Sequence, residues 1–258
     1  MTYCLGLFLE EGLVLLSDTR TNAGIDNVST YRKMHLFHEP GERLIALMSS
    51  GNLAVTQAVV NLLTEGIEAV GLPAEQITET PETLMTVPSM FRAAQLVGEA
   101  VREVYRVDGQ TLEAQGAGFS ASFLLGGQVR GRPMRLFQVY SAGNFIEASS
   151  DTPYLQIGEH KYGKPILDRA VHHQTSLLDG VKLALISMDS TLRSNLSVGL
   201  PADLVIYRRN QHTIEWQHRI EEDDPYFRNL RQIWSDALQK AYQDVPDPDW
   251  LPEDSPLA

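Results

Sequence analysis

The residue best suited to do chemistry stands at the second position of the chain. The sequence opens Met1-Thr2. Because threonine is small, an aminopeptidase should remove the initiator methionine efficiently and leave Thr2 with a free α-amine. A hydroxyl is weakly nucleophilic at its own pKa, whereas an α-amine with a reference pKa of about 8 can accept its proton at neutral pH. Thr2 would then supply nucleophile and base in one residue, although many cytoplasmic proteins also begin Met-Thr.

Three short motifs downstream of Thr2 match a known arrangement. A strand-like run ends in Ser17-Asp18-Thr19-Arg20, Lys33 follows in Tyr31-Arg32-Lys33-Met34, and a glycine turn follows at Met48-Ser49-Ser50-Gly51. This pattern resembles proteasome β-subunits, which combine an N-terminal threonine, an Asp-x-Arg turn, a downstream lysine and a glycine turn. Together with the segment 192–201, it is most similar to the Anbu family, a bacterial relative of the proteasome and HslV peptidases. The similarity runs along nearly the whole chain.

The resemblance implies a catalytic group of Thr2, Asp18 and Lys33. The charge of Lys33 near Thr2 would lower the pKa of the hydroxyl and of the α-amine by repelling protons. Asp18 would hold Lys33 through a charge-assisted hydrogen bond, and Arg20 would brace the turn that carries Asp18. An isolated Asp and Lys would more often be a surface ion pair, but the combined spacing favours the catalytic interpretation.

The resemblance also implies an oxyanion site and a substrate pocket. Backbone N–H groups at Ser50 and Gly51 are the candidates to stabilise a tetrahedral intermediate, and the same turn could equally be an ordinary strand-to-helix connection. Thr21, Asn22 and Met48 match positions that line substrate pockets in the family. Taken alone, a methionine such as Met48 is more often a core residue.

Two positions depart from the family pattern. Active members place a serine in a Gly-Ser-Gly turn near the nucleophile, where this chain has Gly158-Glu159-His160. A later Asp-x-x-Ser motif begins here with Ser194 in place of the aspartate and retains Ser197. We therefore expect Ser194 and Ser197 to support the site, and Glu159 leaves the role of the missing serine open.

Composition excludes several other classes of function. Asp and Glu outnumber Lys and Arg by 33 to 21, and the net charge of −12 disfavours a nucleic-acid partner. The single cysteine, Cys4, cannot form an intrachain disulfide, and the Cys and His residues lack zinc-type spacing, so we infer no metal. The start lacks a signal peptide and no apolar run reaches membrane-spanning length. We expect a cytoplasmic protein that needs no cofactor and no membrane.

The apolar pattern predicts strands, then a helix pair, then strands, a second helix pair and closing strands. Strands are predicted at 3–9, 13–18, 43–49, 121–129, 134–140, 144–148, 203–207 and 213–218, with 20–30 as a loop. Helices are predicted at 53–69, 89–107, 162–174, 176–189 and 226–242, with Phe91 in the buried stripe of the second. This order favours an α+β fold, a four-layer αββα sandwich of two antiparallel sheets. We expect one domain over residues 1–244 and a Pro- and acid-rich extension over 245–258.

These observations lead to one principal function and two alternatives. The principal one is a threonine-type N-terminal nucleophile hydrolase that cleaves a peptide or amide substrate without a cofactor. The family resemblance implies assembly of identical subunits into a ring or an open helical stack, and the sequence leaves open whether an ATP-driven unfoldase joins it. The alternatives are an amidase or isopeptidase with a small substrate, and an assembly subunit whose active site has decayed.

Overall fold

The apolar runs at the start of the chain form inner strands of the first of two five-stranded sheets. Its strands are β1 (Tyr3–Phe8), β2 (Gly12–Asp18), β10 (Tyr154–Gly158), β11 (Ala202–Arg208) and β12 (Trp216–Ile220), in the antiparallel order β10-β1-β2-β11-β12. The predicted tight turn joins β1 to β2, with the Leu9 N–H donating to the Gly12 carbonyl. All of β2 is buried, because it lies in the middle of a sheet that is covered on both faces. The computed structural model describes residues 1–258 except 23–27, 70, 72, 74–79 and 251–258.

The second sheet follows the chain order β5-β6-β7-β8-β9 and is antiparallel throughout. Its strands are β5 (Met34–Glu39), β6 (Arg43–Gly51), β7 (Ala121–Val129), β8 (Arg135–Val139) and β9 (Phe145–Glu147). The predicted meander over 121–148 is confirmed, and its turns use Gly131 and Gly143 at φ values of +73° and +78°, where glycine avoids the steric cost of a side chain. An apolar layer that includes Cys4, Leu13 and Met48 lies between the two sheets.

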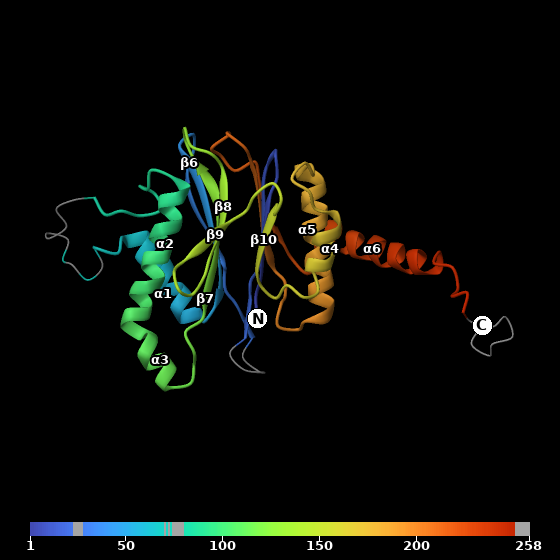
Figure 1. The fold of residues 1–258 in the computed structure, drawn as a ribbon, viewed down its shortest axis with the longest axis horizontal. Coiled ribbons are helices and arrows are strands. Elements are labelled where there is room, and N and C mark those ends of the chain that lie inside the picture. The colour runs from blue at the N-terminus through green and yellow to red at the C-terminus, as the bar shows by residue number, and fades with distance from the viewer. Residues whose placement is uncertain (23–27, 70, 72, 74–79, 251–258) are drawn as a thin grey trace. The chain divides into compact units, whose positions relative to one another are not determined.

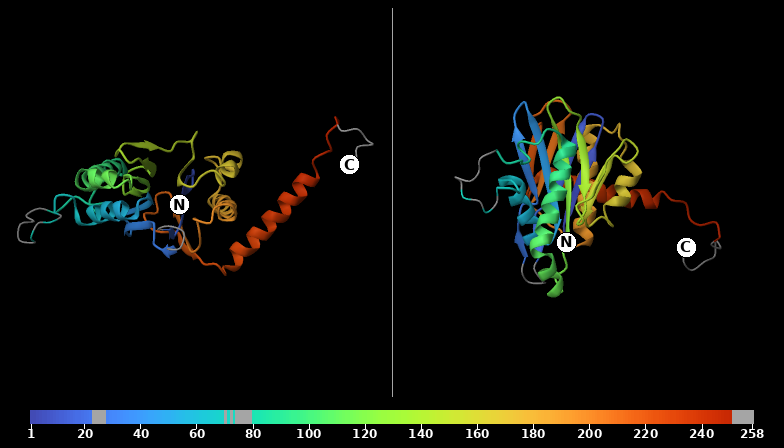
Figure 2. Two further views of the ribbon diagram at one scale, coloured as in Figure 1. Left: turned by 90° about the horizontal axis from the view of Figure 1, so that it is seen from below. Right: turned by 60° about the vertical axis from the view of Figure 1, so that its left-hand side comes forward.

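Helices cover the outer face of each sheet and complete the predicted αββα sandwich (Figures 1 and 2). On the second sheet lie α1 (Leu53–Glu65) and α2 (Met90–Val104), and α2 continues through a π-helical turn (Tyr105–Gly109) into α3 (Gln110–Ala114). On the first sheet lie α4 (Lys164–Ala170) and α5 (Leu177–Ser194). Polar caps begin the long helices: the side chains of Asn52, Ser89 and Ser176 accept hydrogen bonds from backbone N–H groups in the first turn.

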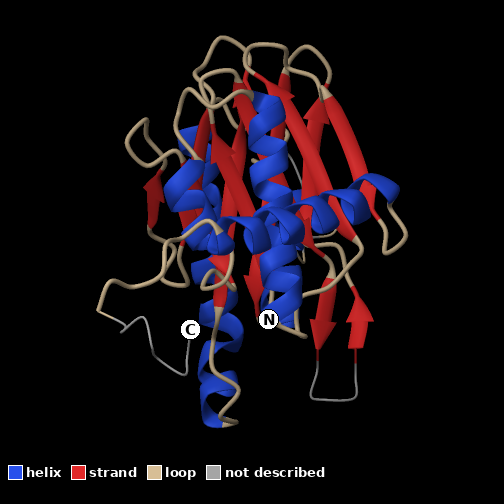
Figure 3. Cartoon of the chain, turned by 90° about the vertical axis from the view of Figure 1, so that its right-hand side faces the viewer, coloured by secondary structure: helices blue, strands red, loops and turns tan. Residues whose placement is uncertain are grey.

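The structure corrects several expectations. Strands β5 and β10 were not predicted, and residues 20–30 contain β3 (Arg20–Asn22) and β4 (Val28–Thr30) in place of a plain loop. Helix α5 runs to Ser194 instead of ending at residue 189. Phe91 is exposed and packs edge-on against Phe145, because it lies at the rim of the helix stripe. Figure 3 shows the two short strands β3 and β4 extending from the same end of the sandwich as the N-terminus.

Contacts divide the chain into two units, Met1–Glu222 and Asp223–Ala258, and residues 223–250, the described part of the second, contain one helix. This helix, α6 (Pro225–Gln243), confirms the helix predicted over 226–242 and begins with an Asp224 side chain that accepts from the Phe227 N–H. The expectation of one domain through residue 244 stays a prediction. None of the helices in the described part of the chain has the length and apolar content that a membrane crossing requires.

Candidate active site

A buried carboxylate, that of Asp18 at the end of β2, is the centre of the candidate site. Its Oδ1 accepts from the Tyr3 backbone N–H at 2.8 Å and from the Lys33 Nζ at 2.6 Å, and its Oδ2 accepts from the Gly199 N–H at 3.4 Å. Burial raises the pKa of the Asp18 carboxyl, while the Lys33 charge and these hydrogen bonds oppose that shift. A buried ion pair is tolerated only when such additional bonds compensate for lost hydration.

Lys33 stands directly before β5 and is held at both ends. Its Nζ donates to the Arg20 carbonyl at 2.7 Å as well as to Asp18. Its own carbonyl accepts from the Ser49 N–H at 3.0 Å, which fixes the lysine backbone to β6. The Lys33 side chain is 4% exposed and that of Asp18 is 0% exposed, so the ammonium is desolvated. Partners on β2, β3 and β6 fix its position.

Thr2 lies immediately before β1 and is 7% exposed, whereas Met1 is exposed. The Thr2 carbonyl accepts from the Glu159 N–H at 2.6 Å. The backbone N–H of the next residue, Tyr3, meets the same Asp18 oxygen that receives Lys33 Nζ. The structure therefore brings together Thr2, Asp18 and Lys33, and the N-terminus lies at one end of the sandwich between the two sheets (Figures 1 and 2).

Arg20 braces the site from the start of β3. Its guanidinium lies against Gly199, where an added Cβ would come within 2.1 Å of the guanidinium carbon, and its Nη1 donates to the Leu196 carbonyl at 3.1 Å. Thr21, next in β3, is half-buried and donates through Oγ1 to the Ser29 carbonyl at 3.2 Å. Asn22 ends β3, and its side chain lies outside the described part of the structure.

Ser50 and Gly51 are the last two residues of β6 and not a separate turn. The Ser49 N–H donates to Lys33, whereas the Asn52 N–H donates to the Ser120 carbonyl at 2.8 Å on the other side of the strand. Because successive N–H groups of a strand point to opposite neighbours, the Gly51 N–H faces the side on which Lys33 lies. The Ser50 N–H faces β7, so the geometry favours Gly51 of the two as an oxyanion donor.

Met48 lies in the apolar layer between the sheets. Its side chain is fully buried and its backbone pairs with that of Met34 in β5. This is the core position that a lone methionine most often occupies. The substrate-pocket role of Met48 stays a prediction, since the isolated chain presents no Met48 surface to a substrate.

Asn195, which was not among the predicted site residues, connects two parts of the site. Glu159 is 4% exposed, and its Oε2 accepts from Asn195 Nδ2 at 2.9 Å. Asn195 Oδ1 in turn accepts from the Ser197 N–H at 2.9 Å. Ser194 is the exposed last residue of α5, so the polar contact comes from the residue after the predicted one. The position of Asn195 as the cap that ends a helix was the only signal available in the sequence.

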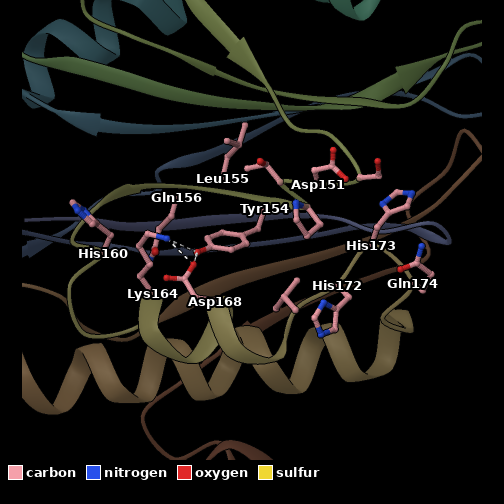
Figure 4. Close-up of a pocket in the computed structure, with 14 residues that line it drawn as sticks. Asp151, Tyr154, Leu155, Gln156, His160, Lys164, Asp168, His172, His173 and Gln174 are labelled. Carbon is pink, nitrogen blue, oxygen red and sulfur yellow. Dashed lines mark hydrogen bonds and ion pairs between the residues drawn. The ribbon is translucent and has the colours of Figure 1, made fainter.

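A pocket with polar side chains lies elsewhere on the first unit, and its lining contains none of Thr2, Asp18 or Lys33. It has a volume of about 620 Å³ and lies along β10 and α4. Lys164 donates to Asp168 at 2.6 Å and to the Tyr154 hydroxyl at 2.8 Å, and the Tyr154 hydroxyl also bonds Asp168 (Figure 4). Among the described residues no group of three His, Cys, Asp or Glu side chains is placed to hold a metal ion.

Many solved structures match this chain, whereas no family model and no curated protein matches it. Anbu from Yersinia bercovieri is 48% identical, with 97% of this chain and 100% of that chain covered and a TM-score of 0.86. Anbu from Hyphomicrobium sp. strain MC1 is 49% identical, with 96% and 99% covered and a TM-score of 0.85. The helical assembly of the Anbu complex from Pseudomonas aeruginosa is 45% identical, with 95% and 98% covered and a TM-score of 0.86. Such identity over nearly the full length confirms the resemblance and the predicted fold, and the chain belongs to the Anbu (ancestral β-subunit) family of proteasome-like proteins.

Proposed function

We propose that this chain is a threonine-type N-terminal nucleophile hydrolase that cleaves peptide or amide bonds with Thr2 as its nucleophile. The observation that carries the proposal is the shared Asp18 oxygen, which receives both the Lys33 ammonium and the backbone N–H next to Thr2. A fixed positive charge beside a threonine favours the deprotonated hydroxyl. The site is desolvated, so this charge acts with less screening than it would in water.

The reaction needs no group beyond the chain, the substrate and water. Once Met1 is removed, Thr2 Oγ1 attacks the carbonyl carbon and its proton passes to the Thr2 α-amine. The C–N bond of the amide breaks, and the leaving amine takes that proton. Water then attacks the resulting ester: its hydroxyl joins the acyl carbon and its second proton returns to Thr2 Oγ1.

The developing negative charge on the substrate oxygen needs a donor near Thr2. The Gly51 N–H, on the Lys33 side of β6, is our candidate. Position 51 requires glycine, because its φ is +126° and an added Cβ would lie 2.2 Å from the Ser120 carbonyl oxygen. Half-buried Thr21 supports a substrate-facing role for β3, with Asn22 beside it in the strand.

We further propose that identical subunits of this chain assemble into an open helical stack. The support is the Pseudomonas aeruginosa relative, which is 45% identical and is described as a helical assembly. An assembly of this kind would place many Thr2 sites at high local concentration without a cofactor. Analytical ultracentrifugation and electron microscopy of the purified chain would distinguish a helical stack from a closed ring or a small oligomer.

The decisive test of the reaction is covalent labelling of Thr2. Protein that begins at Thr2 should gain one adduct from a β-lactone or vinyl-sulfone probe by intact mass, and Thr2→Ala should gain none while keeping its circular dichroism spectrum. An adduct that survives in Thr2→Ala would place the nucleophile elsewhere. Absence of any adduct in protein that begins at Thr2 would favour the assembly-subunit alternative. Cleavage of small amides but not of peptides would favour the small-substrate alternative.

A further inference from the structure

Glu159 is a buried acidic residue whose backbone contacts Thr2 and to which the proposed reaction gives no role. Its N–H donates to the Thr2 carbonyl at 2.6 Å. The preceding Gly158 has a φ of +84°, and an added Cβ there would lie 2.0 Å from the Thr2 carbonyl oxygen. The backbone of residues 158–159 is therefore pressed directly against Thr2.

The Glu159 carboxylate is fixed by neutral donors. Its Oε1 accepts from the Lys161 N–H at 3.0 Å and its Oε2 accepts from Asn195 Nδ2 at 2.9 Å. The Glu159 side chain is 4% exposed, and the donors of both hydrogen bonds, a backbone N–H and an amide, are uncharged. Neutral donors hold the carboxylate in place without cancelling its charge, so the charge acts on its surroundings.

The same segment that holds Glu159 also reaches Asp18. Asn195 bonds Glu159, the Ser197 N–H bonds Asn195, and the Gly199 N–H bonds Asp18 Oδ2. Asp18 and Glu159 are thus two buried acidic residues whose backbone or side chain bonds the Thr2–Tyr3 backbone, but only Asp18 is paired with a lysine ammonium. A carboxylate that is not paired with a cation stabilises a positive charge that forms nearby, such as a protonated amine.

We infer that Glu159 is a positioning residue whose carboxylate stabilises the Thr2 α-ammonium formed when the threonine hydroxyl is deprotonated. The inference rests on the proposed function, because the charge on this amine matters for the reaction only if Thr2 is the nucleophile and its amine the base. Lys33 acts on the amine in the opposite sense, since like charges repel. The other titratable groups on the elements around Thr2 include Tyr3 and Cys4 from β1, Asp18 from β2, Arg20 from β3, Lys33 before β5, Tyr154 from β10, and His160 and Lys161 after β10.

The test measures the protonation of the Thr2 amine and not peptide cleavage. The chain is released from an N-terminal fusion directly before Thr2, treated with acetic anhydride across a pH series, and digested with trypsin. The peptide over residues 2–20 contains no lysine, so after ester removal with hydroxylamine its acetyl group reports the α-amine alone. The midpoint of labelling against pH gives the pKa of that amine.

Glu159→Gln should lower this midpoint by about one unit, because a carboxylate near an ammonium favours the charged form. Glu159→Asp, which keeps the charge, should stay close to wild type. Glu113→Gln removes the same charge from an exposed position on α3 and is the matched control, with no expected shift. If Glu159→Gln does not fold, Glu159→Ser carries the same expectation with a smaller side chain.

An unchanged midpoint in a folded Glu159→Gln or Glu159→Ser variant, or an equal shift in Glu113→Gln, would overturn the inference. These results are independent of the proposed hydrolase activity. If Glu159→Gln shows the expected midpoint shift but the wild-type protein never reacts with a β-lactone, the hydrolase proposal is contradicted and the charge assignment is supported. If the wild-type protein reacts with the β-lactone but Glu159→Gln shows no midpoint shift, the hydrolase proposal is supported and the charge assignment is contradicted.

Discussion

Two lysine–aspartate pairs in this chain have the same Nζ–Oδ1 distance and opposite surroundings. Lys33–Asp18 and Lys164–Asp168 both measure 2.6 Å, but the first pair is 4% and 0% exposed and the second 47% and 50%. The exposed pair spans one turn of α4 and shares the Tyr154 hydroxyl, as Figure 4 shows. Distance alone therefore says nothing about how much each pair contributes.

Burial changes what each pair requires from its neighbours. Asp18 is bonded on both oxygens, by Tyr3, Lys33 and Gly199, because a desolvated carboxylate without such partners would be strongly unfavourable. Asp168 can exchange its partners for water at little cost. The buried pair is therefore an integral part of the candidate site, whereas the exposed pair is a local feature of one helix.

The largest effect is expected from removing the cation of the buried pair. Lys33→Met should lower the free energy of unfolding by about 3–5 kcal/mol, since Asp18 would remain buried and charged without its partner. It should also abolish probe labelling of Thr2. Urea unfolding and intact mass measure the two effects, and Lys164→Met on α4 is the matched control, with a loss below about 1 kcal/mol.

A double variant separates the effect of the unpaired Asp18 charge from the effect of lost packing. In Asp18→Asn with Lys33→Met, the amide oxygen at position 18 can still accept from Tyr3, and no unpaired charge remains. Unfolding free energy should recover by several kcal/mol relative to Lys33→Met alone, about the cost of an isolated buried charge, while labelling stays absent. A double variant as unstable as the single one would mean that lost packing, and not the unpaired charge, causes the instability.

Two glycines with nearly equal backbone angles also differ in their surroundings, here without any charge involved. Gly158 and Gly41 have φ values of +84° and +83°, but only Gly158 has neighbours that an added Cβ would strike. Gly41→Ala should cost about 1 kcal/mol, the penalty for a left-handed residue with a Cβ. Gly158→Ala should cost more than about 2 kcal/mol because it also displaces the Thr2 carbonyl. It should also slow Thr2 labelling.

Equal losses in the two alanine variants, measured by urea unfolding, would contradict this account. They would mean that the backbone beside Thr2 relaxes freely around a new methyl group. The contact between Gly158 and Thr2 would then not position the candidate nucleophile.

Sequence patterns predicted the centre of each sheet better than its edges. Strand β2 reads as a continuous apolar run because both of its faces are covered. The two missed long strands, β5 and β10, are edge strands. They carry polar residues such as His35, His38 and Gln156, so neither strand reads as a continuous apolar run. Edge strands carry such residues because one side of their backbone has no neighbouring strand.

The candidate site shows the same limit. Thr2, Asp18 and Lys33 follow a recognisable spacing near the start of the chain, so the pattern could be found without a structure. The bond between Glu159 and Asn195 joins residues 36 positions apart, and no local signal connects them. Ser194 was predicted by alignment to a family motif, whereas the helix end turns the next side chain toward Glu159.

The smallest effect is expected from the exposed pair. Hydrogen bonds from Lys164 and Tyr154 hold the pKa of Asp168 below its ordinary value. A depressed carboxyl pKa contributes stability above the unfolded-state value of about 3.9 and loses it as pH falls through the folded-state value. Asp168→Asn should therefore cost less than about 1 kcal/mol at neutral pH. That difference should shrink below about pH 4 and in high salt, as urea unfolding would measure.

Asp168→Asn also tests whether burial is the property that separates the two lysine–aspartate pairs. A loss above about 2 kcal/mol, or one that ignores salt, is outside the range of solvated ion pairs. The exposed pair would then behave like the buried one, and burial could no longer be the property that separates them. With a small, salt-sensitive loss and unchanged Thr2 labelling, desolvation at Asp18 remains the physical difference that makes one lysine–aspartate pair part of a candidate active site.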